Sequence, residues 1–344
     1  MIVGLVTGRN RLDLVEVADP VPMDSGVVVD IAFCGICGTD VHAFRSGDSY
    51  NPAICGHEWA GTVSDRGKGV RHLEEGDRVV VAVGASCGTC GPCRAGQYRH
   101  CLSVFLASIG RDPHAPAHGG FASRIAVGAD RVVKTHRALD DVTAAQVEPA
   151  TVALHAVRHS GLRLGDVAVV QGAGPIGLAT VQWARISGAS TVIAVEPDEH
   201  RRRIAVELGA HVALTPSEAS DSGIRDLTNG LGADFVFECV GSATAIQEAV
   251  DRCRRGGSIC LIGLSESPAT IQPASWLIKE ISLTAALAYL HEEFDMTMAM
   301  MADGRFSTAP IHTSTVSLEG LASAFADLAS GSSSEIKVLV DPNR

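Results

Sequence analysis

The sequence predicts an α/β protein with two domains, and a change of pattern along the chain supports this. The first ~150 residues contain short runs rich in Val that Gly and Pro interrupt, which is typical of a mostly antiparallel β domain. From residue 152 onward, apolar strands alternate with helical patterns, and this alternation implies a parallel, doubly wound sheet. A length of 344 residues exceeds one ordinary core and also favours two domains.

The elements of the second part can be placed by residue number. Strands are expected near 167–171, 191–196, 211–215, 234–239, 257–263 and 281–287. The expected helices are 175–186, 198–208 and 291–301. Asp198 is the expected N-cap of the second helix, and Gly188 and Gly209 are expected to end the first two. The tail after residue 290 ends in a strand-like segment, 336–340, which we expect to return to the first domain.

Charge and cysteine content exclude several classes of protein. The net charge of -11 argues against a nucleic-acid partner, because an acidic surface repels phosphate. No apolar run is long enough to span a bilayer, and the start of the chain reads as a strand and not as a signal peptide. Ten cysteines without a signal peptide should remain reduced thiols, which favours metal binding and a cytoplasmic location.

A glycine-rich segment follows the strand 167–171 and opens a helix. Its key residues are Gly172, Gly174, Pro175, Ile176 and Gly177. Such a turn lets the backbone and the helix N-terminus approach a pyrophosphate. The next strand ends in Glu196, whose carboxylate can bind the adenosine ribose and would repel a 2′-phosphate, so NAD is favoured over NADP. Arg201 flanks this position, and any residue of 201–203 could instead meet a 2′-phosphate.

Four cysteines form a compact motif, C-x2-C-x2-C-x7-C. They are Cys87, Cys90, Cys93 and Cys101. Four thiolates this close in a glycine-rich loop suit a tetrahedral structural zinc with no open position. An iron–sulfur cluster is the alternative, but it would place its fourth cysteine three residues on, followed by proline, and neither condition holds.

Three further segments supply mixed sulfur, nitrogen and oxygen ligands. They are Cys34-Gly-Ile-Cys37-Gly-Thr39-Asp40-Val-His42, Cys55-Gly-His57-Glu58 and Glu148-Pro149. Mixed ligand sets are typical of catalytic zinc sites with an open position.

Taken in order along the chain, these segments resemble the zinc-containing medium-chain alcohol dehydrogenase family over essentially the full length. The polyol branch, with butanediol and sorbitol dehydrogenases, is most similar, because Glu148-Pro149 stands where classical members carry a ligand cysteine and Val152-Ala-Leu-His-Ala-Val follows. The resemblance implies a GroES-like, mostly-β catalytic domain, residues 1–151 completed by 290–344. A Rossmann NAD-binding domain with a doubly wound parallel sheet would lie at 152–289.

The resemblance also assigns the catalytic zinc. Cys37 and His57 are implied as ligands, and Glu58 and Glu148 are the two carboxylate candidates, one bound directly and the other holding or exchanging with a bound water. Charge counting disfavours both at once, since Cys37 and one Glu already neutralise Zn²⁺. Asp40 is expected to accept a hydrogen bond from His57 and fix its orientation.

The resemblance implies a proton path and a cofactor pocket. Zinc lowers the pKa of the bound alcohol, Thr39 takes the proton, and the relay continues through the nicotinamide ribose to His42. Val152 is expected to pack against the nicotinamide. Other residues expected to border the cofactor are Val240, Gly241, Gly263 and Leu264.

The expected protein is therefore an NAD-linked enzyme with two zinc ions per chain, which oxidises a secondary alcohol, a diol or polyol, to a ketone. Alternatives are a threonine or sugar dehydrogenase or a carbonyl reductase of the same family, a zinc-free quinone or enoyl reductase, and a non-catalytic zinc module. Arg111, in a loop near the expected substrate pocket, could receive an anionic or heavily hydroxylated substrate. The apolar segment 281–290 favours a homodimer or homotetramer if it lies at a sheet edge.

Overall fold

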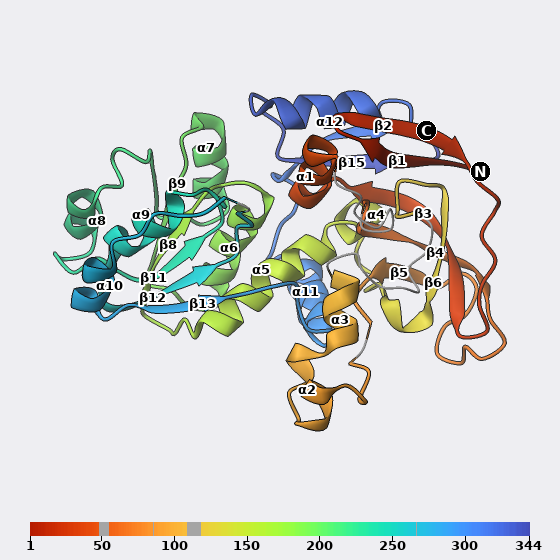
Figure 1. Cartoon of the computed structure of the whole chain (residues 1–344), viewed down its shortest axis with the longest axis horizontal. Helices are drawn as coiled ribbons and strands as arrows, with labels where there is room; N and C mark the ends of the chain where they lie inside the picture. Colours follow the sequence, from red (N-terminus) through yellow and green to blue (C-terminus); the bar gives the residue numbers. More distant parts are fainter. Residues whose placement is uncertain (48–54, 85, 109–117, 266) are drawn as a thin grey trace. The chain divides into compact units, whose positions relative to one another are not determined.

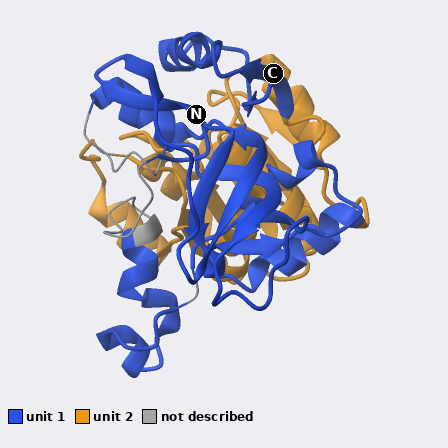
Figure 2. Ribbon diagram, turned by 90° about the vertical axis from the view of Figure 1, so that its right-hand side faces the viewer, with its two compact units in different colours: residues 1–148, 290–302, 312–344 blue, residues 149–289, 303–311 orange. Residues whose placement is uncertain are grey.

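The chain forms two compact units in the computed structural model, which describes residues 1–47, 55–84, 86–108, 118–265 and 267–344 (Figure 2). Unit 1 contains 1–148, 290–302 and 312–344, and unit 2 contains 149–289 and 303–311. One sheet of unit 1 is largely antiparallel and the sheet of unit 2 is parallel, so the predicted fold class is confirmed.

Unit 1 is built on a seven-stranded sheet that contains strands from the first half of the chain and from its C-terminal end. Its strands are β3 (Gly26–Gly35), β4 (Glu58–Arg66), β5 (Arg78–Val81), β6 (Arg124–Gly128), β7 (Val132–Lys134), β14 (His312–Ser317) and β15 (Lys337–Asp341). The order is β14-β15-β3-β4-β5-β7, with β6 paired to β3, and only β14 and β15 run parallel to each other. The C-terminal strand β15 therefore lies beside β3. A separate hairpin joins β1 (Ile2–Gly8) to β2 (Arg11–Glu16).

The helices of unit 1 are short. They are α1 (Gly38–Ser46), α2 (Gly91–Arg94), α3 (Leu102–Ser108), α4 (Asp141–Ala144), α11 (Glu293–Ala302) and α12 (Leu321–Ser330). Helix α12 closes the core through Phe325, whose ring meets those of Phe44 and Phe121 edge-on at centroid distances of 5.5 and 5.7 Å. Helix α5 (Val147–Ser160) runs from unit 1 into unit 2.

Unit 2 is a six-stranded parallel sheet with helices on both faces (Figure 1). Its strands are β8 (Val167–Gln171), β9 (Thr191–Val195), β10 (Val212–Leu214), β11 (Ala233–Glu238), β12 (Cys253–Leu261) and β13 (Ser282–Ala285). Its helices include α6 (Pro175–Ile186), α7 (Glu199–Glu207), α8 (Asp221–Leu227), α9 (Ala245–Arg252) and α10 (Pro273–Lys279). The strand order β10-β9-β8-β11-β12-β13 is that of two mononucleotide-binding halves.

Local signals placed most of these elements correctly. Helix α6 has the predicted bounds, and Asp198 caps α7 by accepting a hydrogen bond of 2.8 Å from the Arg201 N–H. Strand β12 begins earlier than predicted, since Cys253 pairs with Ala233 ahead of an irregularity in the register. In the described part of the chain, every helix is too short or too polar to span a bilayer.

Candidate active site

Three potential metal ligands converge where α1 and β4 begin in unit 1. Cys37 is the N-cap of α1, His57 precedes β4, and Glu58 is the first residue of β4. One ligand atom from each lies within 4.8 Å of the other two. Among the described residues, Glu148 does not belong to this group, although it is buried and lies in the same unit.

Asp40 joins the two segments that carry these ligands. Its fully buried carboxylate accepts a hydrogen bond of 2.8 Å from the Cys37 N–H and one of 3.2 Å from the Gly56 N–H. The His57 Nδ1 atom lies 3.6 Å from the carboxylate, which is ion-pair distance and longer than a hydrogen bond. Asp40 therefore fixes the backbone on both sides of the site and contacts the His57 ring electrostatically.

A buried lysine that the sequence analysis did not single out completes this region. The Lys337 Nζ atom, on β15, donates hydrogen bonds of 2.5 Å to Glu58 Oε2 and 3.1 Å to the Ile36 carbonyl. The side chains of Lys337 and Glu58 are only 2% and 1% exposed. Burial alone would lower the pKa of Lys337, but the negative charges of Glu58 and Cys37 outweigh it and raise that pKa, so the amine is a cation. The sequence contains a signal for this lysine, because it is a charged residue inside the apolar strand expected at 336–340. A lysine that is buried needs a partner.

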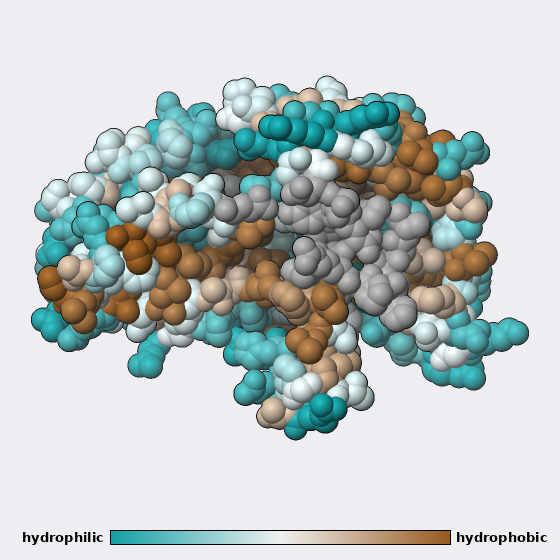
Figure 3. Space-filling model, viewed as in Figure 1, coloured by the Kyte–Doolittle hydropathy of each residue, from teal (hydrophilic) through white to brown (hydrophobic). Residues whose placement is uncertain are grey.

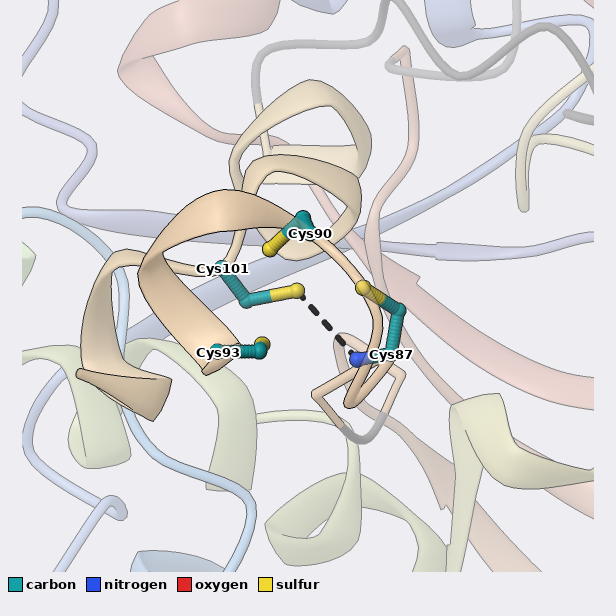
Figure 4. A group of neighbouring side chains, drawn as sticks. All are labelled: Cys87, Cys90, Cys93 and Cys101. Carbon is teal, nitrogen blue, oxygen red and sulfur yellow. Dashed lines mark hydrogen bonds between the residues drawn. The ribbon is translucent and has the colours of Figure 1, made fainter. Parts of the chain in front are cut away.

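The four cysteines of the x2-x2-x7 motif form a second cluster in unit 1. Their sulfur atoms point toward a common centre, and all lie within 4.8 Å of one another (Figure 4). The Cys87 N–H donates to Cys101 Sγ at 3.3 Å. Hydrogen bonds from the backbone N–H groups of Thr89 and Cys90 lower the pKa of the Cys87 thiol to about 5, and hydroxyl donors make a smaller contribution. Four converging sulfur atoms fit a tetrahedral zinc ion.

The glycine-rich turn of unit 2 lies at the carboxyl end of β8, next to β11, where the strand order reverses. Dinucleotides bind at this point in sheets of this type. Gly174 is the N-cap of α6 and Pro175 is its first residue. A Cβ atom at Gly177 would collide with the Gly172 carbonyl, so the turn requires glycine there. A Cβ atom at Gly174 would meet no atom within 4 Å, so the N-terminus of α6 has open space where a phosphate group can bind.

Glu196 directly follows β9 and reaches back to the glycine-rich turn. Its Oε2 atom accepts a hydrogen bond of 2.7 Å from the Ala173 N–H, and Oε1 accepts one of 3.1 Å from the Asp198 N–H. The Arg202 Nη1 atom donates to the carbonyls of Glu196 and Pro197, at 2.8 and 2.6 Å. The backbone thus holds both the carboxylate and this guanidinium in place.

Two turns at the carboxyl ends of β11 and β12 meet through Glu238, which the sequence analysis also missed. Its Oε1 atom accepts hydrogen bonds from the N–H groups of Val240 and Gly241, at 2.7 and 2.8 Å, and its carbonyl accepts from Gly263 at 2.8 Å. Burial raises the pKa of this carboxyl group. Val240 and Leu264 remain half exposed, so they are free to border a ligand.

The remaining predicted site residues fall on helices, with one exception. Thr39 and His42 lie on α1, and the Thr39 Oγ1 atom is 3.8 Å from Cys37 Sγ. Val152 lies on α5 and Arg201 on α7. Arg111 lies outside the described residues.

Two family models match the chain. The alcohol dehydrogenase GroES-like domain matches residues 23–137, and the zinc-binding dehydrogenase domain matches residues 175–303. Among curated proteins, the chain is 32% identical to the 2-dehydro-3-deoxy-L-galactonate 5-dehydrogenase of Pseudoalteromonas atlantica, covering 98% of this chain and 97% of that protein. It is 31% identical to the (R,R)-butanediol dehydrogenase of Bacillus subtilis, covering 97% and 96%.

Two similar crystal structures contain a nicotinamide cofactor. A zinc-binding dehydrogenase from Sinorhizobium meliloti 1021, bound to NADP, has a TM-score of 0.87 and 28% identity, with 99% of each chain covered. An alcohol dehydrogenase from Escherichia coli CFT073, complexed with NADH, gives the same TM-score, identity and coverage. The chain therefore belongs to the zinc-containing medium-chain alcohol dehydrogenase family and is an alcohol dehydrogenase that uses zinc and a nicotinamide cofactor.

Proposed function

We propose that the protein oxidises a secondary alcohol of a diol or polyol to a ketone with NAD⁺. The observation that carries this proposal is the meeting of Cys37, His57 and Glu58 within 4.8 Å in a chain that also holds a complete dinucleotide turn. Relatives named for butanediol and for sorbitol support the substrate class. A sugar acid is the second candidate, since another relative is named for a galactonate derivative.

The chain's own residues would position the substrate and move its proton. Bound zinc acts as a Lewis acid that lowers the pKa of an alcohol, and the nicotinamide accepts the hydride. We propose that the Thr39 hydroxyl takes the alcohol proton and that His42, further along α1, passes it to solvent. Val152 would pack against the nicotinamide. The turns at 240–241 and 263–264 would border it.

We propose two zinc ions per chain, one catalytic and one structural. Cys37, His57 and one or both of Glu58 and Glu148 would hold the first, and the four-cysteine cluster would hold the second.

In this proposal residues 1–151 and 290–344 are the catalytic domain, and 152–289 bind NAD. None of the ten cysteines, all of which lie in the described residues, forms a disulfide, which supports the proposed cytoplasmic location.

We propose NAD⁺ as the preferred cofactor, because the fixed Glu196 carboxylate would repel a 2′-phosphate. Replacing Glu196 with Ser should lower kcat/KM for NAD⁺ about tenfold or more, since a hydrogen bond to a charged group contributes about 1.5–3 kcal/mol. The same variant should gain activity with NADP⁺. Steady-state kinetics with both cofactors checks this, with the exposed Glu199→Ser as a control. A wild type that prefers NADP⁺ would contradict the assignment.

We propose a homo-oligomer, a dimer or tetramer, that forms through the edge strand β13. This strand lies at the end of the sheet, and apolar side chains gather over β13 and α10 (Figure 3). Among them, Leu277 and Leu283 are 78% and 40% exposed.

Leu283→Lys should therefore lower the mass in solution to that of one chain, because a lysine on an edge strand opposes strand pairing. Light scattering after gel filtration measures this. Leu164→Lys is the control, since Leu164 is exposed but lies outside β13. An unchanged mass for Leu283→Lys would exclude this interface.

The proposed function is tested by NAD⁺ reduction at 340 nm with 2,3-butanediol isomers, sorbitol, threonine, inositol, glucose and sugar acids, with zinc analysis on the same sample. We expect turnover with one diol, polyol or sugar acid that disappears when zinc is removed. Turnover that survives complete zinc removal would contradict the mechanism.

A further inference from the structure

The contact between Lys337 and Glu58 crosses three strands. Gly35, on β3, pairs with Glu58 on β4 at one side and with Leu339 on β15 at the other. Residues paired in this way point to the same face of a sheet, and Lys337 lies two positions from Leu339 on that face. A Cβ atom at Gly35 would collide with Glu58 Oε2. The glycine thus leaves the space through which the carboxylate and the ammonium meet.

The same lysine also touches the backbone beside a second ligand. Its Nζ atom donates to the carbonyl of Ile36, the residue before Cys37, at 3.1 Å. Both Lys337 and Glu58 are almost completely buried, so water does not screen their charges. One cation therefore contacts two of the segments that carry the ligand group.

We propose that Lys337 is a positioning residue of the catalytic metal site, which holds one oxygen of Glu58 away from the metal and neutralises that carboxylate. This inference rests on the proposed function. The lysine cation changes the charge count of the metal site. The three anions of Cys37, Glu58 and Glu148 now balance the charges of Zn²⁺ and the lysine together. Glu58 can then lie beside the metal through Oε1 alone, and charge no longer opposes a second carboxylate ligand.

The test uses the purified holoenzyme with Co²⁺ in place of the zinc at Cys37, because the visible spectrum of Co²⁺ reports its coordination number. Lys337→Met should retain the metal but free Glu58 to coordinate it, so the absorption should weaken. Turnover should fall about 10- to 100-fold, mainly in kcat. Lys337→Arg should keep the wild-type spectrum, since it keeps the charge.

A control and a double variant separate this role from a structural one. Lys279→Met removes another largely buried lysine, one that donates to the carbonyls of Val250, Asp251 and Cys253 in unit 2, and it should leave the spectrum unchanged. In a Glu58→Gln background, Lys337→Met should not change the spectrum further, because the lysine acts through Glu58. This comparison remains decisive if the single variant does not fold.

Two results would overturn the inference in different ways. If Lys337→Met lowers the melting temperature but keeps the wild-type spectrum, or changes the spectrum further in the Glu58→Gln background, Lys337 does not position Glu58. If the wild type binds metal only at the four cysteines and shows no turnover, the proposed function fails and the role of Lys337 fails with it.

Discussion

Replacing Thr39 with Val should reduce kcat by about 10²- to 10⁴-fold, which is the usual contribution of a positioned proton acceptor. The hydroxyl of Thr39 lies 3.8 Å from Cys37 Sγ, so it is next to the proposed metal. Valine has nearly the same shape and the same branching at Cβ, and α1 should therefore form as before. Zinc content and NADH binding should remain unchanged.

Thr39→Ser is the matched control, because it keeps the hydroxyl and should keep most of the turnover. Steady-state kinetics, metal analysis and NADH fluorescence on the three proteins together make the comparison. Wild-type turnover in Thr39→Val would remove Thr39 from the mechanism. Loss of zinc from that variant would instead show that the substitution disturbs the ligand group.

Replacing Cys101 with Ala should lower the zinc content from two ions per chain to one and unfold the segment 87–108 locally. The described side chains of this segment form almost no apolar core: Cys93 and Cys101 are buried, whereas Leu102 and Phe105 are 52% and 45% exposed. Metal binding must supply the folding free energy that packing does not, and it amounts to about 10–16 kcal/mol in zinc-finger peptides. We expect a lower melting temperature and rapid proteolysis within this segment.

Cys253→Ala is the control for the loss of a buried thiol. Cys253 and Cys101 are equally buried, each 1% exposed, but Cys253 packs in the core of unit 2 and does not belong to either ligand group. It should retain two zinc ions and resist proteolysis like the wild type. If Cys101→Ala also retained two zinc ions, the four-cysteine site would be wrong.

The features that the sequence predicted well are local ones. The alternation after residue 152 predicted a parallel sheet, and the run from Gly172 to Gly177 predicted a strand, a turn and helix α6. The x2-x2-x7 spacing likewise predicted that four sulfur atoms would converge. In each case neighbours in sequence are neighbours in space, so spacing is sufficient.

The tertiary structure alone decided which distant groups meet. Lys337 and Glu58 are 279 residues apart, and they meet because β15 and β4 both flank β3 at a glycine. The sequence indicated a strand at 336–340, but the side to which its lysine points depends on register and strand order. Glu238 likewise joins the turn after its own strand to Gly263, because β11 and β12 are neighbours in the sheet. Local periodicity carries no information on such pairings of distant strands. The charged groups that surround Cys37 are brought together by these pairings.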